Sequence, residues 1–470
     1  MKSKLLILFF LLTITLSTGF GCKGGDKVAQ KAILDPVEIN FWGVFDSSDN
    51  FETIIAAYQL THPNVTIKYK KMRYEDYEQQ MLESWANGTG PDIFAINNTW
   101  VGKYQNKILP LPATVKIPVI ETTSGFLKKE TKAVIKEYNT LNINQLKNIF
   151  PDVVYKDVTR QEQIYALPLS IDTLALYYNK DLFNAAGIVQ APTTWQEFSE
   201  DVTKLIRLNA KGEFERSAAA IGGANNINRS NDILSLLMMQ NGATMVDGKD
   251  KIAFAKNLNS DSDVRPGEQA LQFYASFAQP SKDVYTWNNT LPESLDMFSS
   301  GKLAMFFGYN YQLPLIKAQA PRINFALANM PHLKNDTTDA FGLPINFANY
   351  WLYTVFKKSA HTDEAWDFLV FLTTKQYQDA NGKPRYYAED YLDTAANPPA
   401  LKSLIQNYQN KYPELAPFAS QILTADSWYR GKNPDEANKI LKQLINTAVL
   451  GNEELYRAIS AAASAIQQSY

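Results

Sequence analysis

The stretch PLSIDTLALYYNKDLFNAAG at residues 168–187, followed by PTTWQEF at 192–198, decides the fold of this chain. Residues 173–178 alternate in size and carry no charge, which predicts a strand with little exposure on either face. Asn179 can cap a short helix that ends at Gly187. Thr194 and Glu197 have the spacing of a capping box and predict the start of a second helix. The segment is therefore expected to run as strand, short helix, loop and helix.

The same segment resembles the family 1 extracellular solute-binding proteins, which are the receptors of bacterial ABC importers. That family has a strand reading approximately D-T-x-x-L-x-Y-N-K-D-L-F-x-x-A-G, followed by P-x-T-W-x-E-F, and the matching positions here are 172–187 and 192–198. Residues 88–93 and 301–305 also resemble family motifs, G-x-x-P-D-I and G-K-x-A-M. The resemblance implies an α/β, two-lobed periplasmic-binding-protein-like fold. Each lobe would be a sheet flanked by helices, with the ligand cleft at the hinge between them.

The first 21 residues have the features of a secretory signal peptide. Two lysines precede an apolar run that is too short to be a convincing membrane span. Cys22, the only cysteine, follows Gly21 and resembles the lipid acceptor of a bacterial lipoprotein, although Gly19 stands where leucine is usual. The alternative is an ordinary secreted protein with an isolated cysteine. The lipoprotein interpretation predicts an extracytoplasmic protein that is lipid-anchored to the cell membrane, at the cell surface or in the periplasm.

Residues 22–35 are then the lipidated cysteine and its tether. Residues 23–31 show no apolar face to bury, so this part is expected to be flexible. Removing residues 1–21 takes away two lysines and no acidic residue, which changes the formal charge from −2 to −4. No basic surface is expected, so nucleic acid is excluded as a partner.

The mature chain begins with alternating strands and helices. The expected elements are strands at 37–42, 62–69 and 93–96 and helices at 51–58 and 74–86. This rhythm predicts a parallel sheet with helices on both faces. The segment 122–138 is rich in lysine and glutamate and is expected to be a solvated helix without chemistry.

The family resemblance also implies where the chain crosses between lobes: near 170–172, near 344–350 and within 380–398. The implied division is 36–170 plus about 345–385 for lobe 1, and about 172–342 plus about 395–470 for lobe 2. Sequence periodicity alone predicts only an α/β protein with two domains.

Catalytic and metal chemistry have little support in the sequence. The three histidines are scattered, and the single cysteine at the anchor leaves no His/Cys zinc pattern. The motifs G-x-S-x-G and H-E-x-x-H are absent. Residues 242–249 resemble a phosphate-binding loop only superficially, because Asp250 replaces the required Ser/Thr. We therefore expect a protein that is not an enzyme and that needs no cofactor or metal.

A carbohydrate site needs aromatic faces for C–H patches and planar polar groups for buried hydroxyls. Such residues should lie at strand ends and lobe crossings. The candidates chosen on these grounds, several of them through the family resemblance, are Trp42, Asp46, Asn97, Trp100, Asp172, Asn226, Tyr309, Tyr311, Asn349, Tyr350 and Trp428. A place in the core is the alternative for Trp42, a helix cap for Asp46, a hinge hydrogen bond for Asp172, and a turn or cap role for Asn226. Trp351 alternates away from its neighbours toward the core, and Trp195 and Trp366 are expected to pack.

The leading hypothesis is the substrate-binding protein of an ABC transporter. It would capture a mono- or oligosaccharide between two lobes and deliver it to permease subunits served by a separate ATPase. It would act as a monomer held on the membrane by its lipid anchor. The alternatives are a binding protein for a polyamine, glycerophosphodiester or peptide, and a surface glycoside hydrolase, which needs two carboxylates facing across the cleft.

Overall fold

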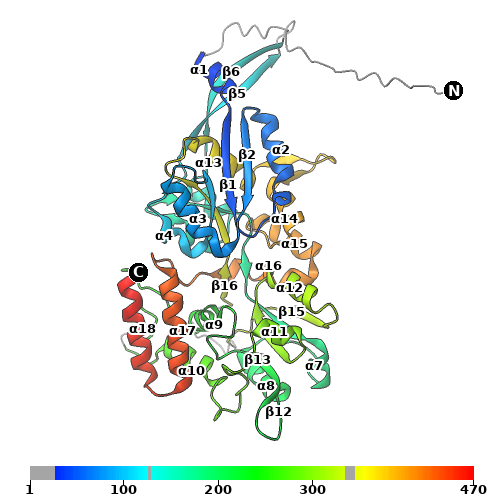
Figure 1. Ribbon diagram of the computed structural model, residues 1–470, viewed down its shortest axis with the longest axis vertical. Coiled ribbons are helices and arrows are strands. Elements are labelled where there is room, and N and C mark those ends of the chain that lie inside the picture. Colours follow the sequence, from blue (N-terminus) through cyan, green and yellow to red (C-terminus); the bar gives the residue numbers. More distant parts are fainter. Residues whose placement is uncertain (1–26, 125–128, 260, 334–343) are drawn as a thin grey trace, which may run out of the picture.

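The computed structural model describes residues 27–124, 129–259, 261–333 and 344–470 (Figure 1). The chain forms two lobes stacked along the long axis, each built on its own sheet, and they meet near β16 (Asn346–Asn349). The signal peptide and Cys22 lie outside the described residues. In the part of the chain that the structure describes, no helix has the length and apolar character needed to cross a bilayer.

The first sheet has six strands. Their order is β2 (Val65–Lys71), β1 (Val37–Gly43), β3 (Ile93–Asn97), β17 (Trp351–Phe356) and β4 (Ile108–Leu109), with β9 (Leu167–Pro168) also paired to β17. β1 is parallel to β2 and β3, as the strand–helix rhythm predicts, whereas β17 is antiparallel to its neighbours. The helices of this lobe are α2 (Glu52–Thr61), α3 (Tyr74–Ala86), α4 (Val101–Tyr104), α5 (Ile143–Ile149), α6 (Asp152–Val158), α13 (Thr362–Thr374) and α14 (Tyr387–Ala395).

The second sheet has five strands, in the order β12 (Arg207–Leu208), β13 (Phe214–Ala220), β14 (Leu303–Gly308), β11 (Ala175–Asn179) and β15 (Phe325–Ala328). β11 is the strand predicted from the family segment, and it is antiparallel to both neighbours. The helices of this lobe are α7 (Lys180–Ala185), α8 (Trp195–Leu205), α9 (Ser230–Gln240), α10 (Pro266–Ser276), α11 (Ser294–Ser299), α12 (Gln312–Gln319), α15 (Ile405–Lys411), α16 (Ala416–Ser420), α17 (Pro434–Leu450) and α18 (Leu455–Ser469).

Local sequence rules explain the elements around β11. The Asn179 side chain accepts hydrogen bonds from the N–H groups of Asp181 and Leu182, and Gly187 has a positive φ of 72° after α7. Thr194 and Glu197 form the predicted capping box at the start of α8. These predictions are confirmed.

The segment 122–138 is not a helix, and that prediction is wrong. β5 (Thr114–Ser124) and β6 (Lys129–Asn139) pair over their full length as an antiparallel hairpin. The β-branched residues at 114–123 start the strand well before the charged stretch, and Val115 and Ile117 bury their side chains in the core. Figure 1 shows the hairpin reaching past the end of the first lobe.

The described part of the predicted tether is largely helical. α1 (Lys27–Leu34) is helical, buries Ala29 and contacts the hairpin. The sequence prediction missed this helix because the surface that covers it belongs to the hairpin, which was itself predicted as a helix.

A small connecting sheet joins the lobes. β10 (Asp172–Thr173) pairs antiparallel with β16, which pairs parallel with β20 (Ala425–Asp426). The first two strands lie at the crossings that the family resemblance implies. After β20 the chain contacts the first lobe again before it enters α17 in the second lobe.

The contact after β20 is centred on Asp157, at the C-terminal end of α6. Asp157 is fully buried, and its carboxylate accepts hydrogen bonds from Asn98, Tyr350 and Ser427 and forms an ion pair with Arg430, Nε to Oδ1 at 2.7 Å. We call these five residues the Asp157 cluster. It ties the first lobe to the residue that follows β16 and to the segment that follows β20.

Replacing Asp157 with Asn should lower the free energy of unfolding by about 3 kcal/mol, because breaking a buried ion pair leaves its partner uncompensated. Urea unfolding followed by circular dichroism measures the change. Asp76→Asn is the control, since its partner Arg73 is 82% exposed and such a pair contributes about 1 kcal/mol or less. Overlapping unfolding curves for Asp157→Asn and wild type would contradict the assigned role.

Candidate functional site

A cavity of about 410 Å³ lies where the lobes meet, with walls from both lobes and from the connecting sheet. Eight of the eleven predicted site residues line it: Asp46, Asn97, Trp100, Asp172, Tyr311, Asn349, Tyr350 and Trp428. They come from strand ends and crossings that are far apart in the chain. The structure therefore brings them together, and their contact with ligand stays a prediction.

Three predicted residues lie outside this cavity and are corrected to structural roles. Trp42 is 8% exposed within the core of the first lobe, with the Lys70 ammonium over its ring. The Asn226 amide donates to the carbonyls of residues 288 and 291 and accepts from Trp287, so it fixes a loop. Tyr309 is 1% exposed, because its hydroxyl turns inward to Asp232 on α9.

The prediction for Trp351 is also wrong, because this residue lines the cavity. It was expected to face the core, but it is half-buried and lines the cavity beside Trp100, with ring centroids 5.6 Å apart. It is the first residue of β17, where the sheet ends and its two faces no longer separate core from solvent. Trp195 and Trp366 are buried in the two lobes as expected.

Amide side chains supply much of the polar lining. Asn97 ends β3 and donates from Nδ2 to Oδ1 of Asn349 at the end of β16, at 2.8 Å. Asn97 also caps the short 3-10 helix η2 (Asn98–Trp100), which holds Trp100 against the cavity. The other cavity-lining amides are Asn228, Asn231, Asn397 and Asn438. Such groups can both donate to and accept from ligand hydroxyls.

The second lobe contributes a paired charge. Arg229 donates from Nε to Asp232 at 2.7 Å, and Tyr309 donates to the same carboxylate oxygen. Burial opposes the charge of Arg229, but Asp232 raises its pKa above the ordinary value. Arg229 has a left-handed backbone (φ 60°), a strained conformation for this residue type that recurs at binding sites.

The first lobe contributes Asp46, a carboxylate bound by two phenol groups. Tyr353 and Tyr391 both donate to it. Burial raises the pKa of Asp46, and these two hydrogen bonds and Lys71 oppose that rise. The carboxylate is therefore fixed in the wall by its neighbours.

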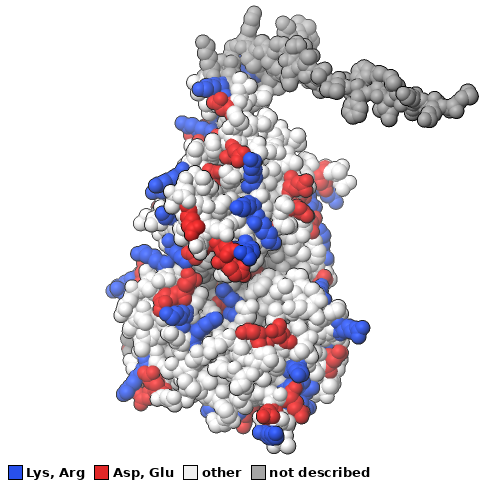
Figure 2. Space-filling model, in the orientation of Figure 1, with Lys and Arg blue, Asp and Glu red and all other residues white. Residues whose placement is uncertain are grey.

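An ion pair crosses between the lobes at the edge of the cavity. Lys103 on α4 lies 2.8 Å from Asp435 in the first turn of α17, and it also pairs with Glu78 on α3. Figure 2 shows positive and negative side chains interspersed over the visible face, including the region where the lobes meet.

Sequence reasoning did not select several lining residues, among them Phe45, Tyr74, Arg229 and Asp232. Phe45 follows the first strand with Asp46 and was left out of the chosen set, whereas Tyr74 follows the second strand and could have been found by the same strand-end rule. Asp232 gave no signal, because it lies inside α9, whose residues are all buried.

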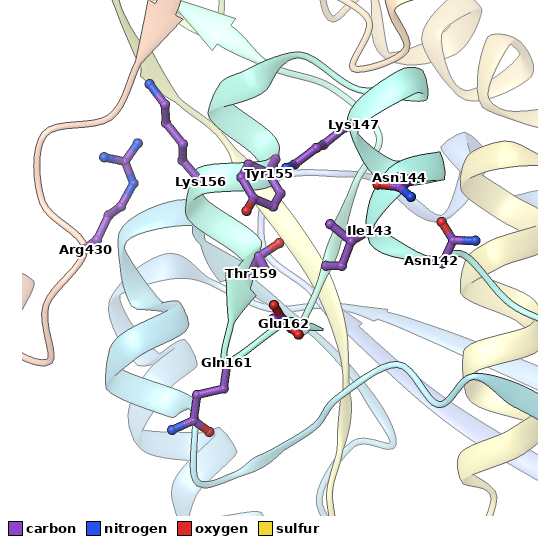
Figure 3. A pocket seen from close by; sticks show the side chains of 10 residues that line it. All are labelled: Asn142, Ile143, Asn144, Lys147, Tyr155, Lys156, Thr159, Gln161, Glu162 and Arg430. Carbon is purple, nitrogen blue, oxygen red and sulfur yellow. The ribbon is translucent and has the colours of Figure 1, made fainter. Parts of the chain in front are cut away.

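A second recess, of about 780 Å³, lies on the first lobe, lined by α5, α6 and the hairpin of β7 (Thr159–Arg160) and β8 (Gln163–Ile164), with Arg430 at one side (Figure 3). No predicted site residue lines it. Lys147 covers the ring of Tyr155 at 3.9 Å, and Lys156 and Arg430 are already paired with acids. The junction cavity is therefore the better candidate site.

The site shows no arrangement for metal binding. The described residues contain no group of three or more His, Cys, Asp or Glu side chains that could hold a metal ion. The cavity combines amides, phenols, indoles and fixed carboxylates, which suits recognition of a polar, partly apolar ligand.

Residues 45–379 match the sequence profile described as bacterial extracellular solute-binding protein. The chain belongs to this family. It is 20% identical to the galactooligosaccharide-binding protein of Bacillus subtilis, over 98% of this chain and 96% of the relative. It is 24% identical to the sn-glycerol-3-phosphate-binding periplasmic protein of Salmonella typhimurium, over 87% of this chain and 80% of the relative.

Solved structures share the fold. The cyclic α-maltosyl-1,6-maltose binding protein of Arthrobacter globiformis has a TM-score of 0.70 at 18% identity, over 92% of this chain and 99% of that one. A cyclo/maltodextrin-binding protein in complex with maltotetraose has a TM-score of 0.67 at 15% identity, over 92% and 97% of the two chains. The predicted two-lobed fold is confirmed.

Asp172 is the one predicted carboxylate at the first crossing. Its Oδ1 accepts a hydrogen bond from the backbone N–H of Asn310 at 3.1 Å. Burial raises its pKa from 3.8 to about 7, although backbone N–H groups of Asn310, Thr173 and Tyr311 oppose the rise. Burial raises the pKa of Tyr177 and Tyr408, and the nearby Asp172 carboxylate raises both further.

Asp172 should make the ligand-free protein less stable as pH rises toward 7. Between pH 3.8 and about 7 the folded state keeps a proton that the unfolded state has released, so folding stability falls across this window. Melting temperatures measured from pH 5 to 8 should fall for wild type relative to Asp172→Asn. Asp49→Asn on the surface is the control, and parallel wild-type and Asp172→Asn curves would refute the shift.

Proposed function

We propose that this protein is the substrate-binding component of an ABC importer and that it captures a carbohydrate between its two lobes. The observation that carries the proposal is the junction cavity, where indole and phenol rings from the first lobe face Tyr311 and amides from the second. Aromatic faces cover the C–H patches of a sugar ring, and amides satisfy the hydroxyls that lose water on burial.

Charge in the cavity supports a neutral ligand over a phosphodiester. Arg229 is the only lysine or arginine among the described lining residues, and Asp232 already binds it. A glycerophosphodiester would need an unpaired cation there. The relatives named for galactooligosaccharide and multiple sugars support the same choice, whereas those named for sn-glycerol-3-phosphate support the alternative.

The hydrolase alternative needs two free carboxylates across the cleft. Four line the cavity: Asp46, Asp172, Asp232 and Asp435. Each of them already accepts a hydrogen bond from a protein group or forms an ion pair with one. These contacts hold the four carboxylates in place within the wall of the cavity. Product analysis in the test below distinguishes binding from hydrolysis.

Transport would follow from closure of the lobes on the ligand, because a ligand that contacts both favours the closed state. Permease subunits would recognise that state, with ATP hydrolysis by a separate subunit. We assign residues 36–170 plus about 345–385, together with α14, to lobe 1. Residues from about 172–342 plus about 395–470 form lobe 2. The protein would act as a monomer.

Binding can be tested by a thermal-shift screen of mono- and oligosaccharides, polyamines, glycerophosphodiesters and peptides, with mass analysis of the recovered compound. A saccharide at 100 times its Kd should stabilise the protein by about 2.7 kcal/mol and be recovered intact. Stabilisation by another class alone would overturn the ligand class, and cleavage products would establish the hydrolase instead.

We also propose that Cys22 carries a lipid anchor after removal of residues 1–21. Cys22→Ser should move the protein from the membrane fraction to the soluble fraction, because multiple acyl chains hold a protein stably on a membrane. Cell fractionation and labelling with radioactive palmitate measure this. Wild-type protein in the soluble fraction without label would show an ordinary secreted protein.

A further inference from the structure

Four aromatic side chains form one continuous wall on the first-lobe side of the cavity. Trp100 contacts Trp351, with ring centroids 5.6 Å apart, and Trp351 contacts Phe45 at 5.3 Å. Phe45 in turn stacks on Tyr74 at 5.9 Å and an interplanar angle of 25°. All four line the cavity, so the wall has no break between Trp100 and Tyr74.

Exposure changes along this wall. Trp100 is 7% exposed, whereas Phe45 is 56% exposed and Tyr74 is 51% exposed. The wall therefore starts inside the cavity and ends at its outer rim. The exposed rings of Phe45 and Tyr74 lie side by side at this rim and form an apolar surface that the fold does not bury. An exposed apolar surface of this kind marks a binding site.

The exposed end of the wall is fixed by hydrogen bonds to its backbone. Lys71 donates to the Phe45 carbonyl at 2.8 Å, and Tyr69 donates to the Asp46 carbonyl at 2.8 Å. Asp46 is also held by Tyr353 and Tyr391 through its side chain. Phe45 is therefore presented to solvent by a rigid loop, which lowers the entropy cost of binding.

We propose that Phe45 and Tyr74 form an outer subsite that stacks on a further ring of a linear oligosaccharide whose first rings occupy the cavity. This inference rests on the proposed carbohydrate function and specifies the length of the oligosaccharide that the protein binds. Continuity with Trp351 and Trp100 identifies the occupant as an extension of the ligand in the cavity. Short sugars would end at Trp351, and longer sugars would continue along the wall to the rim.

The test measures affinity against ligand length. Isothermal titration calorimetry with maltose to maltohexaose, and with β-1,4-galactobiose to galactohexaose, gives wild-type affinities that should rise beyond two rings. The double variant Phe45→Ala/Tyr74→Ala should lose about tenfold for the longest sugar that binds and less than twofold for the disaccharide. Stacking on an aromatic ring contributes about 0.5–1.5 kcal/mol, which two rings convert to a loss of this size.

Two further variants separate stacking from other effects. Phe45→Tyr/Tyr74→Phe keeps both rings and should retain the length dependence. Tyr138→Ala removes a 40% exposed ring from the hairpin of the same lobe and should change no affinity.

Equal losses for short and long sugars, or none, would overturn the outer subsite while leaving the proposed function intact. A wild-type affinity that stops rising at two rings would also overturn it. If wild type binds none of the sugars in the titration or the thermal-shift screen, the subsite and the proposed function fail together.

Discussion

The buried carboxylate of Asp157 is the interaction on which the junction of the lobes depends. It gathers Asn98, which follows a strand of the first lobe, Tyr350, which follows β16, and Arg430, which follows β20. A buried charge is costly unless each of its lone pairs has a partner, so these segments must meet in one arrangement. Positions 98, 350 and 430 are remote in sequence, and this cluster fixes their register.

The candidate site is built on that register. Asn97 and Asn349 lie 252 positions apart, yet they bond because the residues that follow them meet at Asp157. The same residues lead into the rings of Trp100 and Trp351, which begin the aromatic wall. The arrangement of the side chains that line the cavity thus depends on the buried Asp157 carboxylate, which need not contact the ligand itself.

The sequence predicts those parts of the structure that depend on near neighbours. The caps at Asn179 and Thr194 require only residues within four positions, and the strand-end rule requires only the order of elements. The failures involve partners far away in the chain. Tyr309 turns inward because Asp232 is on a helix that passes behind it, whereas Tyr311, two positions later, remains 44% exposed. The hairpin at 114–139 was missed because its charged second strand obscured the alternation of the first.

The late position of β17 and β20 in the chain affects the order of folding. The first sheet receives β17 from residues 351–356, and the Asp157 cluster is completed only at Arg430. A chain that folds from its N-terminus cannot complete the first lobe until most of the second lobe has followed it. Until β17 pairs with it, β3 has one unpaired edge, and strands with an unpaired edge are prone to mispairing. The two distant strands thus link the assembly of the first lobe to the completion of the second.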